Sequence, residues 1–267
     1  MADVRGRIDL TRPNAARMYD YYLGGSANLA VDQQAADEAI AMIPQIVDGS
    51  RANRAFLRRA VRYFLDQGVR QFLDLGSGIP TAGHVHEIAH AADPTSRVAY
   101  VDMEPVAVAH TRRLLAGTAN VGVAEADLRD PESVLAAPEV VELIDPSRPV
   151  AVLLVAVLHF VPDNDSPREL VRTYRRRFAP GSYLALSHLT DHFDTPARMA
   201  EVAELYSRSS HPEFPRSWEQ FTDLLDGCPP VPPGVVYTPQ WRPDPGDPAW
   251  QRPELSGHFA AAVPARP

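Results

Sequence analysis

Short apolar runs alternate with segments of helical spacing from Val69 onward. Apolar runs without internal alternation are typical of strands that are buried on both faces of a sheet. Such runs predict strands at 70–75, 97–102, 120–125, 149–158 and 182–187. Helical spacing predicts crossover helices at 81–92, 105–116, 131–143 and 166–179. This β–α order predicts a parallel sheet with helices on both faces, and the most apolar run, Val150–Leu158, should lie near its centre.

The segments on either side extend this prediction. Before Val69, helical spacing and the helix-ending residues Gly24, Gly25 and Gly68 predict helices at 14–22, 32–42 and 50–67. Further helices are predicted at 195–208 and 216–225, followed by an antiparallel hairpin of 234–242 and 256–263. We therefore expect a seven-stranded sheet core over residues 69–267, preceded by an N-terminal helical cap over residues 1–68.

Composition and charge exclude several classes of function. The net charge is −8, and nucleic acid is not expected as the main partner because phosphate binding needs a concentrated positive surface. All 26 basic residues are arginine, which excludes a lysine Schiff base. Cys228 is the only cysteine, so neither an intramolecular disulfide nor a multi-cysteine metal site is expected, and we expect no metal. Without a signal-peptide pattern or a membrane-spanning apolar run, we expect a soluble, cytoplasmic protein with no membrane partner.

A glycine-rich turn, Asp74-x-Gly76-x-Gly78, follows the first predicted strand. Glycines at these positions let the backbone turn tightly against a ligand before the next helix. The dinucleotide fingerprint G-x-G-x-x-G would need a third glycine where this chain has Thr81. The carboxylate of Asp74 would also repel a pyrophosphate, whereas it attracts the sulfonium and ammonium groups of S-adenosylmethionine (SAM). The turn predicts a SAM site, with an ordinary strand–turn–helix connection as the alternative.

Acidic residues also follow the second and third predicted strands. Asp102, with Met103 beside it, is placed to accept hydrogen bonds from both ribose hydroxyls of a bound nucleoside, although it could instead cap the helix that starts near Pro105. Asp127 can accept a hydrogen bond from the adenine amino group, and Leu128 can pack on the adenine ring. Both acids therefore suit the adenosine part of SAM.

The exit of the fourth predicted strand holds the candidate catalytic residue. This strand neighbours the first at the switch point of such sheets, where ligands bind, so Ala156 is expected to contact the cofactor. His159 could act as a general base or hold the substrate. The alternative is a packed histidine that closes the strand, and His188 after the fifth strand is a weaker candidate.

Together, the glycine turn, the two acids, the strand-four exit and the terminal hairpin resemble a class I SAM-dependent methyltransferase over residues 69–263. The resemblance implies an α/β, Rossmann-like, seven-stranded sheet with SAM as cofactor. One departure is Pro80, which stands where the common pattern D-x-G-x-G-x-G has its third glycine.

The N-terminal segment Pro13–Gly25 and the segment Arg51–Leu57 extend the resemblance along almost the whole chain. They are similar to the S-adenosyl methyltransferase branch formerly treated as a domain of unknown function. In such folds a helical cap often covers the methionine end of SAM. The expected polar groups for the SAM carboxylate or for the acceptor are Arg17, Tyr19, Tyr21, Asn53 and Arg54, with core packing as the alternative for the tyrosines.

The predicted function is methyl transfer from SAM to an unidentified small-molecule acceptor. A SAM-binding sensor or non-catalytic partner protein on the same fold is the first alternative, because no catalytic base is evident from a motif alone. An NAD(P)-dependent oxidoreductase is the second, and Asp74 and Thr81 count against it. The residues do not predict the acceptor or the oligomeric state.

Overall fold

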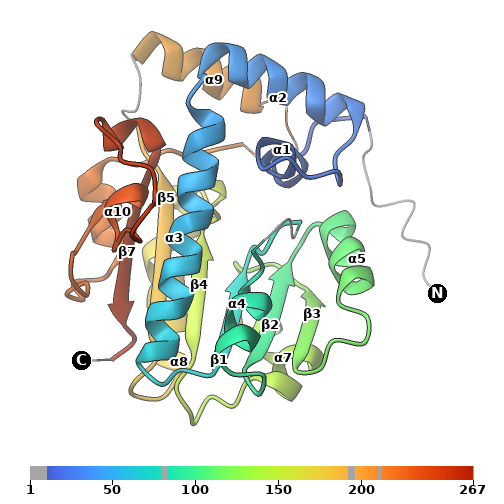
Figure 1. The fold of residues 1–267 in the computed structure, drawn as a ribbon, viewed down its shortest axis with the longest axis vertical. Helices are drawn as coiled ribbons and strands as arrows, with labels where there is room; N and C mark the ends of the chain where they lie inside the picture. Colours follow the sequence, from blue (N-terminus) through green and yellow to red (C-terminus); the bar gives the residue numbers. More distant parts are fainter. Residues whose placement is uncertain (1–10, 80–82, 192–195, 208, 210–211, 267) are drawn as a thin grey trace.

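A seven-stranded sheet forms the centre of the computed structural model, which describes residues 11–79, 83–191, 196–207, 209 and 212–266 (Figure 1). The strand order is β3-β2-β1-β4-β5-β7-β6. β1 to β5 are parallel, and β7 runs antiparallel to both β5 and β6. The strands are β1 (Gln71–Leu75), β2 (Arg97–Asp102), β3 (Val121–Glu125), β4 (Ala151–Val155), β5 (Tyr183–Leu189), β6 (Val236–Tyr237) and β7 (His258–Pro264).

The predicted sheet is confirmed, and β4 is the fourth of its seven strands. Two predicted strand ends are wrong. The strand predicted at 149–158 ends at Val155, because Ala156 has a left-handed φ of 53° and Leu158–Phe160 forms a 3-10 turn. The hairpin partner predicted at 234–242 pairs only over Val236–Tyr237, since the chain then enters a second 3-10 turn.

Helices cover both faces of the sheet. On one face lie α3 (Ile46–Asp66), α4 (Val85–Ala92) and α5 (Pro105–Leu114), and on the other lie α6 (Pro131–Ala136), α7 (Pro138–Leu143), α8 (Pro167–Arg177) and α10 (Trp218–Leu224). The single helix predicted at 131–143 is split, because Pro138 keeps the preceding Ala137 in an extended conformation (ψ 133°). The helix predicted at 81–92 begins in the described structure at Val85, and residues 80–82 lie outside the described part.

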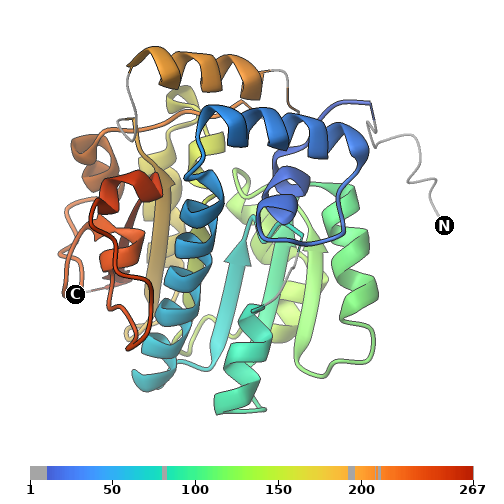
Figure 2. The same ribbon diagram turned by 45° about the horizontal axis from the view of Figure 1, so that its top comes forward.

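A helical layer lies over the carboxyl ends of the strands (Figure 2). It consists of α1 (Ala15–Tyr22), α2 (Ala30–Met42) and α9 (Pro196–Ser207), which share an apolar cluster that includes Met18, Ala36 and Leu205. The helix predicted at 195–208 is thus α9, and its two end positions lie outside the described residues. No helix in the described part of the chain is long and apolar enough to cross a membrane.

The long helix α3 connects this layer to the sheet. Its residues Phe56 and Phe64 are fully buried in the same cluster as Phe72 of β1 and Leu153 of β4. The expected boundary at residue 68 therefore separates residues that share one hydrophobic core. We call α1, α2 and α9 the cap, and treat α3 as part of the sheet layers.

Candidate functional site

A cavity lies between the cap and the carboxyl ends of β1, β2, β4 and β5. Most sequence-predicted site residues line it. They are Tyr19, Asn53, Arg54, Asp74, Gly76, Gly78, Asp102, Met103, Asp127, Leu128, Ala156 and His159. Arg17 and Tyr21 are not among the described residues that form its wall. Residues that were predicted separately, mostly from different strand ends, thus line one continuous cavity.

The glycine turn brings β1 against the exit of β4. Gly76 has a φ of 69°, and its amide donates a hydrogen bond to the carbonyl of Val101 (2.8 Å). A Cβ at position 76 would lie 2.1 Å from Cγ2 of Val157, so only glycine allows this close approach. Gly78 also has a positive φ (63°), but a Cβ there would meet no atom of the described residues within 4 Å. It faces the open cavity.

Asp102 holds this turn in place. Its Oδ2 accepts a hydrogen bond from the amide of Gly78 (2.7 Å) and its Oδ1 accepts one from the amide of Glu104 (2.8 Å). The residue at the N-cap of α5 is Glu104, so Asp102 connects two loops of the site rather than capping the helix. Beside it, Met103 is 44% exposed although it lines the cavity, which leaves an apolar surface for a ligand to cover.

Asp74 and Arg54 are two charged residues of the cavity wall with unused polar atoms. The carboxyl group of Asp74 is buried and forms no hydrogen bond with any residue that the structure describes. Burial raises the pKa of Asp74 to about 7; nearby Arg54 lowers this pKa and Asp102 raises it. Arg54 donates from Nη2 to the carbonyl of Gly83 (3.3 Å), while its buried Nε lacks a partner among the described residues.

Asp127 forms a close ion pair with Arg129 (2.6 Å), and Arg129 also reaches Asp165 (3.2 Å). Partial burial would raise the pKa of Asp127, but the hydrogen bonds from Arg129 lower it overall. Leu128 packs against the core with its side chain, and its carbonyl accepts a hydrogen bond from the hydroxyl of Tyr174 (2.8 Å). This loop is therefore held firmly at the cavity wall.

Comparison with known proteins assigns the family. The model of a family described as S-adenosyl methyltransferase matches residues 1–266. The chain belongs to this family. It is an enzyme that uses SAM as methyl donor, so the family excludes the oxidoreductase and does not support the non-catalytic alternative.

Solved structures agree with this assignment. A methyltransferase from Thermobifida fusca YX shares 37% identity, with a TM-score of 0.88 and 99% of each chain covered. A DUF574 family protein from Streptomyces avermitilis MA-4680 shares 36% identity, with a TM-score of 0.89 and coverage of 95% of this chain and 97% of that one. The SAM-dependent methyltransferase SibL shares 18% identity over 97% of this chain and 64% of its own, with a TM-score of 0.52, and so shows only the fold. No curated protein sequence matches the chain.

In this methyltransferase a chain of hydrogen bonds joins the cap to the exit of β4. The hydroxyl of Tyr19 donates to the carbonyl of Ser50 (3.1 Å) and accepts from Nδ2 of Asn53 (3.0 Å). Asn53 Oδ1 accepts from the hydroxyl of Ser187 (2.6 Å), which accepts from the amide of Ala156 (2.9 Å). Tyr19 and Asn53 thus line the cavity with polar groups that are already used, and they fix the left-handed turn at Ala156.

His159 lines the cavity as a buried histidine whose Nδ1 has no hydrogen-bond partner among the described residues. Burial lowers the pKa of His159 well below its ordinary value, and the neighbouring His188, His258 and Arg216 lower it further. The ring is therefore neutral at physiological pH. His188 differs, because its Nδ1 bonds the carbonyl of Leu189 (2.8 Å) and its Nε2 accepts from Arg216 (2.6 Å). That histidine is packed and fully satisfied.

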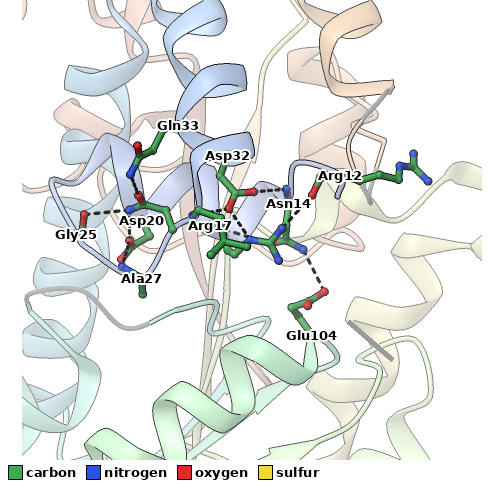
Figure 3. Close-up of polar contacts among 11 residues, drawn as sticks. Arg12, Asn14, Arg17, Asp20, Gly25, Ala27, Asp32, Gln33 and Glu104 are labelled. Carbon is green, nitrogen blue, oxygen red and sulfur yellow. Dashed lines mark hydrogen bonds and ion pairs between the residues drawn. The ribbon is translucent and has the colours of Figure 1, made fainter. Parts of the chain in front are cut away.

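Arg17 and Tyr21 organise the cap instead of the cavity. Arg17 is 1% exposed, and its Nε donates to Oδ2 of Asp32 (2.6 Å), which also accepts from the amide of Leu29 (Figure 3). Tyr21 donates its hydroxyl to Asp37 on the surface of α2 (3.0 Å). Both residues join α1 to α2. The sequence alone does not show whether a polar side chain on a helix binds a ligand or, as here, a residue of the neighbouring helix.

Several cavity residues were not predicted as site residues, and three of them, Tyr22, Tyr206 and Glu213, lie close together. The hydroxyls of Tyr22 and Tyr206 form a hydrogen bond (2.8 Å), and Glu213 lines the same part of the cavity. Tyr22 was not among the candidate site residues, and Tyr206 and Glu213 belong to no motif. Their position became visible only when α9 was placed over α1.

Proposed function

We propose that this methyltransferase binds SAM with its adenosine at the loops after β2 and β3 and its methionine part at Asp74 and Arg54. In this proposal it acts in the cytoplasm on a small molecule held between the cap and β4. The observation that carries it is the opposite charge of two unused groups in one cavity: the Asp74 carboxyl and the Arg54 Nε. They match the ammonium and the carboxylate of an amino acid.

The adenosine side is supported by the residues around Asp102. A carboxylate offers about four lone-pair sites, more than its two backbone donors use, so it can also accept bonds from vicinal hydroxyls. The exposed side chain of Met103 and the side chain of Leu128 provide apolar surfaces for a purine ring. Asp127 remains the proposed acceptor for the adenine amino group, with Arg129 fixing its orientation. Gly76, Gly78 and Ala156 supply the close backbone turns that leave this space open.

The bound cofactor supplies an electrophilic methyl group, and the chain has to align the acceptor with it and exclude water. The cap lies over the carboxyl ends of the strands, and just before α1 Asn14 Nδ2 donates to Glu104 in the loop after β2 (3.1 Å). His159 is the proposed proton acceptor for the nucleophile, because a neutral imidazole with an unpaired nitrogen can take a proton.

Calorimetric titration with S-adenosylhomocysteine (SAH) tests the cofactor site. Arg54→Gln should weaken SAH binding about 10- to 150-fold, the range expected when a hydrogen bond to a charged group is lost. Arg51→Gln is the matched control, because Arg51 lies one turn earlier on α3 and pairs with Asp48 at the surface. The control should bind SAH as the wild type does. Neither variant should bind NAD. Equal SAH affinity in both variants would show that Arg54 does not contact the bound cofactor.

A further inference from the structure

One part of the cavity is not used by the proposed cofactor site. It lies next to the apolar cluster of the cap, and we call it the cap lobe. Its wall is formed by Tyr22, Ile43, Leu189, Tyr206, Glu213 and Pro215. Tyr22, Ile43 and Tyr206 belong to the apolar cluster of the cap, and Leu189 packs against that cluster. The lobe is therefore apolar and aromatic, apart from two hydroxyls and one carboxyl group.

The carboxyl group of Glu213 has no counter-ion among the residues that the structure describes. It forms neither a hydrogen bond nor an ion pair with any residue in the described part of the chain. Burial raises the pKa of Glu213 to about 8, and no cation of the described ranges lowers it. Its charge also raises the pKa of Tyr22 and of Tyr206, in both cases after the larger effect of burial, so the carboxyl group lies near both tyrosines in the cavity wall.

The other acids of the cavity wall differ from Glu213. Asp102 accepts hydrogen bonds from two backbone amides, and Glu104 accepts one from Asn14. Asp127 is paired with Arg129, and Asp74 has Arg54 nearby. A carboxyl group that is taken out of water without a partner destabilises the folded chain. Glu213 thus contributes nothing visible to stability. Such groups in a cavity are candidates for ligand binding.

We propose that the cap lobe binds a positively charged nitrogen of the methyl acceptor, with Glu213 as its counter-ion and the rings of Tyr22 and Tyr206 against it. This inference rests on the proposed methyltransferase function and adds the class of acceptor, a small amine. An ammonium group would supply the missing charge for the carboxylate, and the faces of tyrosine rings attract cations. A neutral or anionic acceptor would leave the carboxyl group unpaired.

The test compares amines with alcohols of the same skeleton, because each pair differs mainly by one charge. Benzylamine, phenethylamine and tryptamine are titrated calorimetrically into the protein saturated with SAH, each beside its alcohol. We expect the wild type to bind at least one amine, and to bind it more tightly than its alcohol. Glu213→Gln should weaken that amine about 10- to 150-fold and leave the alcohol unchanged. Glu219→Gln, an exposed change on α10, is the matched control and should leave both unchanged.

The outcomes separate this inference from the proposed function. SAH binding is measured first, and its absence in the wild type would refute the proposed cofactor site. With SAH bound, the inference is overturned if no amine binds, if the alcohols bind as tightly as the amines, or if Glu213→Gln keeps the wild-type amine affinity. Melting curves show whether Glu213→Gln is folded. Glu213→Asp keeps the charge and should retain more amine affinity than Glu213→Gln.

Discussion

Acidic residues that are buried or line the cavity fall into two kinds at the scale of single residues. Asp32 accepts from Arg17 and from two backbone amides, and Asp102 accepts from two amides, so both hold the structure together. Asp74 and Glu213 have no hydrogen bonds to described residues, and both line the cavity. A low-dielectric site strengthens every charge interaction. A charged group of a ligand should therefore interact most strongly with Asp74 and Glu213, which have no hydrogen-bond partners among the described residues.

The pH dependence of SAH binding should reveal Asp74. With a pKa raised to about 7 by burial, Asp74 is protonated below that pH and ionised above it. The ammonium group of SAH stabilises the carboxylate, so binding below pH 7 must release a proton. The affinity for SAH should therefore fall as the pH is lowered from 8 to 5, by at most about tenfold per pH unit below 7. Calorimetry across this range measures it.

The control for this prediction is Asp74→Asn, which cannot titrate. Its affinity for SAH should be weak at pH 8 and nearly independent of pH down to 5. Arg54, Asp102 and Tyr100 are the charged or titratable groups that interact with Asp74, and all three remain in the variant. A wild-type affinity that does not change with pH would show that Asp74 does not contact the ammonium group.

The residues predicted at the ends of the first four strands all line the cavity, whereas those predicted on helices line it only in part and some cavity residues in loops were not predicted. Asp74, Asp102 and Asp127 were predictable because parallel strands bring their carboxyl ends to one edge. Arg17 was not, because a polar residue on a helix can find its partner on another helix, here Asp32. Glu213 lies between α9 and α10 without periodicity or motif, so only the packed structure places it in the cavity.

The elements of the sheet were predicted well, because uninterrupted apolar runs leave few alternatives to buried strands. The errors lie at the ends of helices and strands, where the backbone conformation of a single residue determines whether the element continues. Ala156 ends β4 with a left-handed φ, a conformation that is unusual for alanine and that no sequence pattern announces. The amide of this residue is held by Ser187, which is itself fixed by Asn53 of α3. The end of one strand thus depends on a distant helix.

Two glycines of the β1–α4 connection provide a matched comparison. Both have positive φ, so Gly78→Ala should cost about 1–2 kcal/mol of unfolding free energy, the penalty of a left-handed residue. Gly76→Ala carries the same penalty and also places a Cβ 2.1 Å from Val157. Overpacking adds about 1–3 kcal/mol, so this variant should be clearly less stable. Urea denaturation measures both. Equal losses of unfolding free energy in the two variants would mean that the end of β1 can move away from Val157 without destabilising the protein.

At the scale of the whole molecule, the site is shared by segments that are far apart in the chain. The cap combines α1 and α2 from the N-terminal region with α9 from beyond β5 (Figure 1). The sheet supplies the cofactor loops, and α3 takes part in both the cavity wall and the core. The expected division at residue 68 separates α1 and α2 from α9, although the three helices share one apolar cluster. A ligand in the cavity should therefore couple the cap to the sheet.

Removal of residues 1–44 tests this coupling. The cut lies before α3, so the helix that covers the sheet stays intact, while Asn14, Tyr19 and Tyr22 leave the cavity wall. We expect a protein that still unfolds cooperatively, is less soluble because Leu205 and Tyr206 lose their cover, and binds SAH poorly. At 100 times the dissociation constant, SAH should stabilise the full chain by about 2.7 kcal/mol. The melting temperature of the shortened chain should rise much less at the same concentration.

A milder variant keeps this prediction testable if the shortened chain does not fold. Asp32→Asn leaves every cap residue present but removes the counter-ion of the buried Arg17, which should cost about 3–5 kcal/mol of stability. If the cap forms the roof of the cavity, this loss should loosen α1 and α2 and weaken SAH binding. Asp37→Asn, an exposed change on the same helix that affects only the bond from Tyr21, is the control and should bind SAH normally. Wild-type affinity in both the shortened chain and Asp32→Asn would show that the sheet alone binds the cofactor and that the cap serves only the acceptor.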